Sequence, residues 1–269
     1  MMKNVLAIAG SDSSGGAGIQ ADLKTFSAHG VFGMTVITAV TAQNTSRVID
    51  VQDISPDMIG KQIDAIFEDI NVDAVKIGMV SKIESIKVIA ERLREYKPKI
   101  IVLDPVMISK SGYALLKPDA IKTLISELLP LSTVVTPNAP EAEKISGIKI
   151  KTMPDMKRAA KIIHDMGAEN VLVKGGHIEG SHSTDFLFDG KSFNVYESEY
   201  IKTKNTHGTG CTLSSAIASN LALGMDIVSA VDNAKKYITS AIMHSLAIGK
   251  GNGPTHHFYE LYKKAGILC

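Results

Sequence analysis

Short β-branched apolar runs alternate with longer segments of helical period along most of this 269-residue chain. This alternation constrains the fold more than any other feature, because runs joined by helical segments build βαβ units around a parallel sheet. The apolar runs predict strands over residues 5–9, 36–42, 74–77, 100–103, 134–135 and 171–173. The intervening segments predict helices over residues 17–28, 56–70, 83–96, 119–129, 155–166, 209–223 and 227–245. The sequence therefore predicts an α/β fold with a central, mostly parallel sheet.

A further pattern predicts a β-hairpin, because runs over 185–189 and 192–196 flank a Gly190-Lys191 turn. No repeat, linker or low-complexity segment divides the chain. Hydrophobic residues make up 45% of it, which at this length supplies a sizeable core. We therefore expect residues 1–269 to form a single domain.

The charge balance and the cysteine count restrict partners and location. Lys and Arg total 29 and Asp and Glu total 28, so no global field attracts the chain to nucleic acid or acidic membranes. No apolar run reaches the roughly 18 residues of a membrane span, and the opening MMKNVLAIAG is too short for a signal peptide. Only Cys211 and Cys269 are present, which argues against a disulfide framework or a zinc site. We expect a cytoplasmic protein with neither nucleic acid nor membrane as a partner.

Polar and glycine residues follow the predicted strands. In an open α/β sheet, ligands bind beyond the carboxyl ends of the strands, where loops and helix N-termini converge. Those ends carry Gly10, Gln43-Asn44, Gly78-Met79, Asp104-Pro105, Thr136-Pro137-Asn138 and Lys174-Gly175-Gly176. Any single position also fits an ordinary turn. Their gathering on one rim predicts a binding site there.

The first predicted strand runs into GSDSSGGAG, residues 10–18, whose glycines let backbone amides approach a ligand closely. It is not a Walker A loop, because no Gly-Lys-Ser/Thr ends it. Residues 16–21 fit a loose GxGxxA dinucleotide pattern, but Thr38 and Thr41 stand where the ribose-binding acid is expected. A glycine-rich turn that binds nothing also fits.

The strongest local signal is NTHGTGCT, residues 205–212, followed by an apolar helical segment. Its glycines free the amides of residues 208–211 to converge on one anion, and a helix dipole adds positive potential. Such a site suits the charge that develops on a transferred phosphoryl group. An ordinary helix start capped by Thr206 or Thr209 is the alternative.

Cys211 falls in the first turn of that helix, where the dipole should favour its thiolate. It would then deprotonate an attacking hydroxyl as a general base. A small buried hydrophobe, which is the usual fate of a lone cysteine, is the alternative.

Two carboxylates and two lysines suit a nucleotide and its metal. Asp104 ends a strand and Glu141 follows in NAPE, so both could bind Mg²⁺ through water. Asn138 and Glu141 also have the spacing of a capping box, which needs no metal. Lys174 and Lys235 could neutralise phosphates, although lysines are commonly just solvated.

Gln43 has an amide that offers an acceptor and donors in one plane, matching the adjacent ring nitrogen and amino group of an aminopyrimidine. Met79 and Val106 end other strands and would wall the ring faces. The alternative is an exposed glutamine and two core side chains.

The order of these segments resembles that of one family, the hydroxymethylpyrimidine/phosphomethylpyrimidine kinases of the ribokinase-like superfamily. The resemblance covers essentially the whole chain and rests on GSDSSGGAGIQADLKTFSAHG, TAQN, KIGM, DPVM, TPNAPEAE, KGGH, TKNTHGTGCTLSSAIA and GKGNGPTHHF. It implies a three-layer αβα sandwich, ATP and Mg²⁺ as cosubstrates, and a homodimer. It also implies phosphorylation of 4-amino-5-hydroxymethyl-2-methylpyrimidine and then of its monophosphate.

The resemblance further implies roles for single residues. It gives pyrimidine recognition to Gln43, with Gly10, Asp22, Met79 and Val106 as further substrate contacts. It gives the anion hole to Gly208, Thr209 and Gly210 and the base position to Cys211. It gives metal binding to Asp104 and Glu141, and nucleotide contacts to Asn138, Thr209, Lys174 and Lys235.

The mechanism implied by this assignment places the substrate hydroxyl between Cys211 and the γ-phosphorus. A phosphate oxygen is already ionised in the second step, so the hypothesis is that Cys211→Ala harms the first step more. Segments 10–18 and 109–112 would close over the substrate. Cys269 is expected to have no catalytic role.

Three other functions compete with this one. Pyridoxal kinases share the fold and the anion hole, and a thiol adds reversibly to an aldehyde, but TAQN, KIGM and Gln43 suit the pyrimidine better. A nucleotide- or vitamin-binding regulator would not need Asp104, Glu141, Lys174 and Cys211 together. A nicotinamide oxidoreductase would need the absent ribose-binding acid.

Overall fold

The computed structural model describes residues 1–107, 116–175 and 182–267. In these residues, nine strands form one sheet in the order β3-β2-β1-β4-β5-β6-β7-β8-β9. The strands are β1 (Asn4–Asp12), β2 (Phe32–Gln43), β3 (Val48–Asp53), β4 (Ala74–Ile77), β5 (Ile101–Leu103), β6 (Val134–Val135), β7 (Asn170–Lys174), β8 (His182–Phe188) and β9 (Phe193–Glu199). From β2 through β7 the neighbours are parallel, whereas β3, β8 and β9 each pair antiparallel. The predicted α/β fold with a mostly parallel sheet is confirmed.

The central strands supply two separate apolar cores, one on each face of the sheet. In β1, Leu6 and Ile8 belong to one core, and Val5 and Ala7 belong to the other. Successive side chains of a strand point to opposite faces, so a strand covered on both sides is apolar throughout. This double burial is why the central strands were visible in the sequence as continuous apolar runs.

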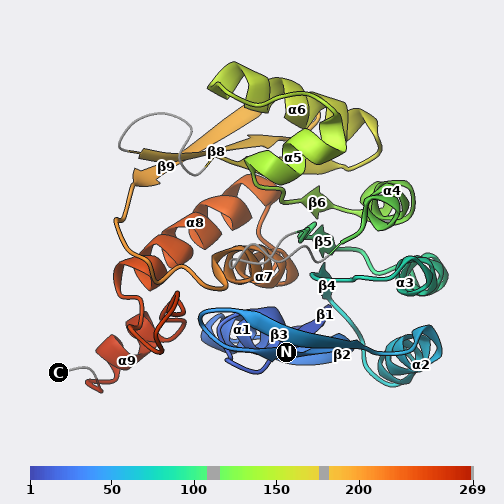
Figure 1. Cartoon of the computed structure of the whole chain (residues 1–269), viewed down its shortest axis with the longest axis horizontal. Helices are drawn as coiled ribbons and strands as arrows, with labels where there is room; N and C mark the ends of the chain where they lie inside the picture. The colour runs from blue at the N-terminus through green and yellow to red at the C-terminus, as the bar shows by residue number, and fades with distance from the viewer. Residues whose placement is uncertain (108–115, 176–181, 268–269) are drawn as a thin grey trace.

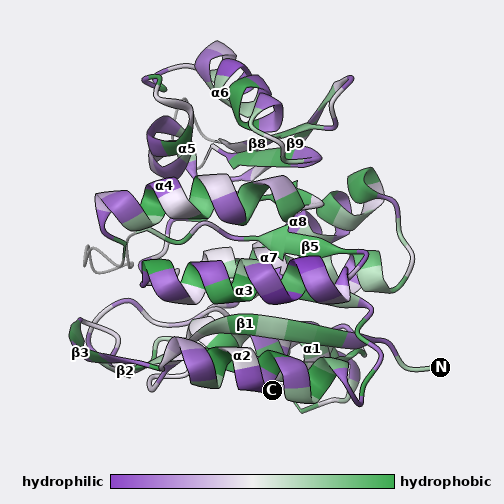
Figure 2. Cartoon of the chain, turned by 90° about the vertical axis from the view of Figure 1, so that its right-hand side faces the viewer, coloured by the Kyte–Doolittle hydropathy of each residue, from purple (hydrophilic) through white to green (hydrophobic). Residues whose placement is uncertain are grey.

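Helices cover both faces and complete a three-layer αβα arrangement (Figure 1). One core receives side chains from α2 (Pro56–Phe67), α3 (Ile83–Tyr96), α4 (Pro118–Glu127), α5 (Ala139–Ser146) and α6 (Met153–Asp165). The other receives them from α1 (Gly18–Ala28), α7 (Thr209–Ala222) and α8 (Ile227–Met243). A short 3-10 helix (Leu129–Leu131) precedes β6, and α9 (Tyr259–Lys264) lies near the carboxyl end. Figure 2 shows α2 and α3 with both polar and apolar residues, as expected for helices with one buried face.

Helix α7 is buried on all sides, and every residue from Thr212 to Ala222 is buried. It packs against α1, α8 and the central strands β4 and β5. Small residues such as Ala216 and Ser219 allow this close approach. The enclosure fixes the start of α7 beside the carboxyl ends of the strands. Although α7 and α8 are rich in apolar residues, no helix in the described ranges is long and apolar enough to cross a membrane.

The predicted elements match the observed ones most closely in the middle of the chain. The ranges 74–77, 83–96 and 134–135 coincide with β4, α3 and β6. The predicted hairpin is confirmed as β8 and β9, both longer than expected. Besides the short 3-10 helix, β3, α5 and α9 lie outside the predicted ranges. β3 is a largely exposed edge strand and α9 has no buried residue, so neither carries the apolar period of a core element. Helix α5 has only eight residues, too few to show a clear helical period.

Candidate active site

The carboxyl ends of the parallel strands surround a cavity of about 590 Å³. The start of α7 and the first turns of α1 and α5 close it. The predicted site residues that line it are Gly10, Gln43, Met79, Asp104, Val106, Asn138, Glu141, Lys174, Gly208, Thr209, Gly210 and Cys211. Asp22 and Lys235 are the predicted site residues that do not line it.

The predicted anion-binding turn forms the start of α7. Gly208 precedes the helix with a φ of 77°, in the left-handed region. A Cβ atom there would lie 1.7 Å from the Gly16 carbonyl oxygen, so only glycine fits. The first i to i−4 hydrogen bond runs from the Thr212 amide to the Gly208 carbonyl at 2.9 Å. The amides of Gly210 and Cys211 precede this bond and are available to an anion.

A side-chain cap at this turn, which was the alternative interpretation, is not formed. The Thr209 hydroxyl donates to the Thr206 carbonyl at 2.8 Å, and the residue before the helix makes no side-chain capping bond. Neither threonine therefore supplies an oxygen acceptor to the free amides. The positive end of the helix dipole therefore faces the cavity lining with no side-chain hydrogen bond capping it.

Cys211 lies partly buried in the first turn of α7. Burial raises the pKa of its thiol to about 11, and the carboxylates of Asp22 and Asp104 add to the rise. Lys76 and the Gly18 amide act in the opposite direction and do not compensate. The expectation of a thiolate favoured by the helix terminus was therefore wrong, because desolvation outweighs the dipole.

Asp22 lies outside the cavity lining, so the prediction that it contacts substrate does not fit the structure. Its carboxylate accepts hydrogen bonds from Lys76 Nζ at 2.8 and 3.0 Å and from Ser215 Oγ at 2.7 Å. Burial alone would lower the pKa of Lys76, but the Asp22 carboxylate raises it, so the lysine is charged. Helical period explains the misplacement, because Asp22 shares the buried face of α1 with Ile19 and Phe26.

Lys235 is also outside the cavity lining, although it was predicted to contact a nucleotide. Its Nζ donates to Asp185 Oδ2 at 2.7 Å and to the backbone and hydroxyl oxygens of Ser183 at 3.3 and 3.2 Å. The side chain is only 10% exposed. The structure therefore places Lys235 against β8. The predicted closing segment 109–112 and Cys269 lie outside the described residues.

Asp104, Glu141 and Lys174 form a charged cluster at one end of the cavity. Lys174 Nζ donates to Asp104 Oδ1 at 3.2 Å. Glu141 Oε2 accepts from the Asn138 amide at 2.8 Å, and Asn138 Oδ1 accepts from the Glu141 amide at 2.9 Å. The predicted capping box is therefore present at the start of α5. It fixes Glu141 beside the other charges.

This cluster fits a hydrated divalent cation. Burial raises the pKa of the Glu141 carboxyl to about 7. The Lys174 ammonium opposes this rise, and the Asp104 carboxylate adds to it. A buried carboxyl whose pKa is raised by a neighbouring carboxylate is relieved by a cation nearby. Within the described ranges, no three His, Cys, Asp or Glu side chains are grouped to hold a metal ion. The pair therefore suits an ion that keeps most of its water, as Mg²⁺ does, better than a complete protein cage.

Gln43 and apolar side chains form a second part of the cavity lining. Gln43 ends β2 and is partly buried. Met79 and Val106 follow β4 and β5 and are also partly buried. A Cβ atom at Gly10 would lie 2.6 Å from Met79 Cε, so glycine lets the methionine lie across the end of β1. This part of the lining therefore combines one amide with apolar side chains, which suits a flat polar ring.

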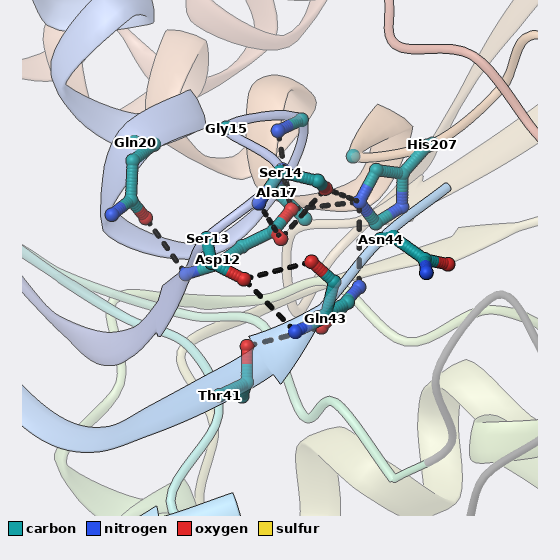
Figure 3. A network of polar contacts seen from close by, with 12 residues as sticks. Asp12, Ser13, Ser14, Gly15, Ala17, Gln20, Thr41, Gln43, Asn44 and His207 are labelled. Carbon is teal, nitrogen blue, oxygen red and sulfur yellow. Dashed lines mark hydrogen bonds and ion pairs between the residues drawn. The ribbon is translucent and has the colours of Figure 1, made fainter. Parts of the chain in front are cut away.

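A buried hydrogen-bonded pair that was not predicted lies beside Gln43 (Figure 3). His207 Nε2 lies 2.7 Å from Asp12 Oδ2, and both side chains are almost fully buried. Asp12 also accepts from the Ser14 hydroxyl at 2.7 Å and from the Ala17 amide at 2.8 Å. Burial would raise the pKa of Asp12, but His207 and Ser14 lower it below its ordinary value. The carboxylate thus orders the glycine-rich turn.

Sequence spacing could not have paired these two residues. They are 195 positions apart, and each lies inside a glycine-rich motif whose backbone drew attention first. The usable signal was their position, because Asp12 is the last residue of β1 and His207 immediately precedes Gly208 at the start of α7.

The fold and the cavity together define a class of protein. An uncapped helix terminus, a lysine and two carboxylates at one end are the parts of a phosphoryl-transfer site. An amide and apolar side chains elsewhere in the same lining suit a small ring. These parts characterise a small-molecule kinase.

Comparison with known proteins agrees with this class. The family model of phosphomethylpyrimidine kinase matches residues 12–256. The hydroxymethylpyrimidine/phosphomethylpyrimidine kinase of Rhizobium meliloti (strain 1021) is 53% identical over 261 residues, covering 96% of this chain and 98% of that protein. The protein of the same name from Bacillus subtilis (strain 168) is 47% identical and covers 94% of each chain. This chain belongs to the phosphomethylpyrimidine kinase family.

Solved structures place the fold in the same group. The phosphomethylpyrimidine kinase of Clostridium difficile 630 is 56% identical, with a TM-score of 0.81 over 89% of this chain and 99% of that chain. The pyridoxal kinase of Bacillus subtilis, solved as an ADP complex, is 42% identical, with a TM-score of 0.91 over 97% and 99%. The backbone thus resembles both kinds of kinase, while sequence identity is higher to the pyrimidine kinase.

Proposed function

We propose that this protein is a bifunctional kinase of thiamine biosynthesis. It transfers a phosphoryl group from ATP to the hydroxymethyl group of 4-amino-5-hydroxymethyl-2-methylpyrimidine, and then to the resulting monophosphate. One observation carries the proposal: a single cavity is lined both by Gln43 and by the anion-binding start of α7. Membership of the phosphomethylpyrimidine kinase family supports both steps.

The proposed reaction depends on positioning and charge. Gln43 holds the pyrimidine edge, and Met79 and Val106 enclose its faces, so that the hydroxymethyl group faces Cys211. The amides at the start of α7 and the ammonium of Lys174 stabilise negative charge on the transferred group. In such a site most of the acceleration comes from orientation and preorganised dipoles.

Asp104 and Glu141 would hold Mg²⁺ through water, with Asn138 fixing Glu141 through the capping box. When bound, the ion supplies positive charge that offsets the charge on the triphosphate. Deprotonated Glu141 suits this role, so binding of the ion should favour its ionised form.

The role proposed for Cys211 follows from its neutral thiol. A thiol whose pKa is near 11 is a poor base at pH 7, so it orients the hydroxyl rather than removing its proton in advance. A largely dissociative transition state needs little nucleophile activation. Cys211→Ala should still reduce the first step more than the second, because only the first uses a hydroxyl. Equal losses with the two substrates, supplied separately, would remove any proton-handling role.

A coupled assay of ADP release tests the function directly. The purified protein receives ATP and Mg²⁺ with hydroxymethylpyrimidine, its monophosphate or pyridoxal in parallel. Turnover of both pyrimidines with little on pyridoxal is the expected result. Fast turnover of pyridoxal alone would instead assign the protein to vitamin B6 salvage, which the structural likeness to pyridoxal kinases keeps as the second candidate. Silence on all three would favour a binding protein.

We also propose the broader setting of the enzyme. The family match over 12–256 and the continuous sheet support a single kinase domain over residues 1–269. The use of ATP and the free thiol of Cys211 suit the reducing cytoplasm. The resemblance to the family supports a homodimer, for which light scattering should give about twice the chain mass.

A further inference from the structure

The amide of Gln43 lies between two fixed polar groups (Figure 3). On one side its Nε2 is 3.4 Å from His207 Nε2. On the other side its Oε1 is 3.3 Å from Thr41 Oγ1. Each neighbour can either donate or accept a hydrogen bond at this point. That property decides whether the amide oxygen or the amide nitrogen can face it.

The carboxylate of Asp12 fixes the hydrogen on His207. Asp12 Oδ2 lies 2.7 Å from His207 Nε2 and, as an ionised carboxylate, can only accept. The hydrogen bonds from His207 and Ser14 keep the pKa of Asp12 low, although burial opposes this. His207 Nε2 must therefore carry a hydrogen. A protonated nitrogen facing the NH₂ group of Gln43 is a contact between two donors.

The carbonyl of Ser11 fixes the hydrogen on Thr41 in the same way. Thr41 Oγ1 donates its single hydrogen to the Ser11 carbonyl oxygen at 2.9 Å. The hydroxyl then turns a lone pair toward Gln43, at 3.3 Å. A lone pair facing the amide oxygen is a contact between two acceptors. Both mismatches vanish together when the amide turns by about 180° about its last bond, because O and N exchange places.

We propose that Asp12 and His207 act as positioning residues that fix the orientation of the Gln43 amide, with its oxygen toward His207 and its nitrogen toward Thr41. The amide then has one lone pair and one N–H free for the substrate, in a single defined order. The inference rests on the proposed function, because it explains how the site reads the pyrimidine edge.

The fixed order selects between rings of the same shape. A 4-aminopyrimidine offers a ring nitrogen that accepts beside an amino group that donates, which pairs with a free N–H beside a free oxygen. The 4-oxo analogue offers the reverse order, a ring N–H beside a carbonyl. Because the hydroxymethyl group must face Cys211, the ring cannot turn over to compensate. The locked amide therefore favours the amino compound.

Asp12→Asn tests the lock. The new amide group can donate to His207, so Nε2 can become an acceptor and release Gln43 to present either order. The measurement is kcat/KM for 4-amino-5-hydroxymethyl-2-methylpyrimidine and for its 4-oxo analogue. We expect the amino-to-oxo ratio to fall by about 10-fold or more, which is the cost of one mispaired buried polar contact. The change should appear in KM rather than kcat, because the edge contact is equal in ground and transition states.

Ser14→Ala is the matched control. It removes the 2.7 Å hydrogen bond to Asp12 and the weaker 3.5 Å contact with His207 Nε2, but leaves the carboxylate and its 2.7 Å contact with His207. If a substitution only disturbs the glycine-rich turn, kcat/KM should fall by the same factor for both substrates. The amino-to-oxo ratio should then stay unchanged, as we expect for Ser14→Ala. Thr41→Val provides a second variant if Asp12→Asn folds poorly, and it should lower the ratio by removing the other fixed neighbour.

The outcomes separate this inference from the proposed function. If the wild-type protein does not phosphorylate the aminopyrimidine, the proposed function fails. If it does, and neither Asp12→Asn nor Thr41→Val changes the ratio, the lock is wrong while the function stands. A ratio that falls in both variants and holds in Ser14→Ala supports the lock.

Discussion

Two buried lysine–aspartate pairs lie near Cys211, and they differ in enclosure. Lys76 and Asp22 are 2.8 Å apart, and both side chains are completely buried. Lys174 and Asp104 are 3.2 Å apart, with side chains 16% and 3% exposed. Both pairs consist of a lysine and an aspartate, and both join residues far apart in the sequence.

The difference lies in what each pair leaves available. Asp22 receives Lys76 on both oxygens and Ser215 as well, so the pair joins β4, α1 and α7 outside the cavity lining. Lys174 lines the cavity, and the Glu141 carboxylate, like that of Asp104, raises the pKa of its ammonium group. Enclosure, rather than charge or residue type, thus separates a pair that stabilises the scaffold from a pair that can meet a ligand.

Lys76→Met should give the largest effect, on stability. Removing the ammonium leaves the Asp22 carboxyl enclosed without its counter-charge, and burial already raises the pKa of that carboxyl. Loss of one partner of such a pair costs about 3 to 5 kcal/mol of the free energy of unfolding. Urea unfolding measures the loss. The double variant Lys76→Met with Asp22→Leu removes both charges and should recover most of it. A single variant as stable as wild type would show that the enclosed pair contributes nothing.

Lys174→Met should act on catalysis more than on stability. Its ammonium faces the cavity, so kcat should fall about 10²- to 10³-fold, as for the loss of one group that stabilises transition-state charge. The free energy of unfolding should fall less than in Lys76→Met, because Asp104 lines the cavity and can be hydrated there.

Lys144→Met is the control for Lys174, since Lys144 is exposed but lines the same cavity. It should reduce kcat by less than about 10-fold, since an exposed charge is screened by solvent. Equal losses in the two variants would mean that burial of Lys174 has no catalytic importance.

Glu141→Gln should give the smallest effect, and one that depends on pH. The pKa of Glu141 in the folded chain is raised from 4.5 to about 7 by burial, so the folded chain keeps a proton that the unfolded chain releases. Stability of the wild type therefore falls as pH rises from about 4.5 through 7. The variant lacks this titration and should gain about 1 to 3 kcal/mol relative to wild type between pH 5 and pH 8. Urea unfolding with a chelator measures it, and a difference that stays constant with pH would contradict the shift.

The sequence predicted the layers and the rim of the site because these depend on local pattern. Strands buried on both faces show continuous apolar runs, and parallel strands bring their carboxyl ends together whatever the details of packing. Gly208 and Cys211 were placed correctly for the same reason, since glycines before an apolar helix mark its start.

The remaining site features depend on contacts between distant residues. The pairing of Asp12 with His207 and of Lys235 with Asp185 follows from how helices and strands are docked. The raised pKa of Cys211 has the same origin, since enclosure by neighbouring elements outweighs the helix terminus that the sequence displays. Asp22 was misplaced because its motif gave no indication that it faces the core.

The contact between Gly16 and Gly208 has a consequence for changing the substrate of this enzyme. A Cβ atom at Gly208 would meet the Gly16 carbonyl, and one at Gly16 would lie 2.3 Å from the His207 ring. The glycine-rich turn beside Gln43 is therefore in direct contact with the turn proposed to receive the phosphoryl group. Laboratory evolution of new substrate preference through residues 14–17 should consequently alter turnover at the same time, whereas changes at Met79 or Val106 can reshape the pocket and leave that contact intact.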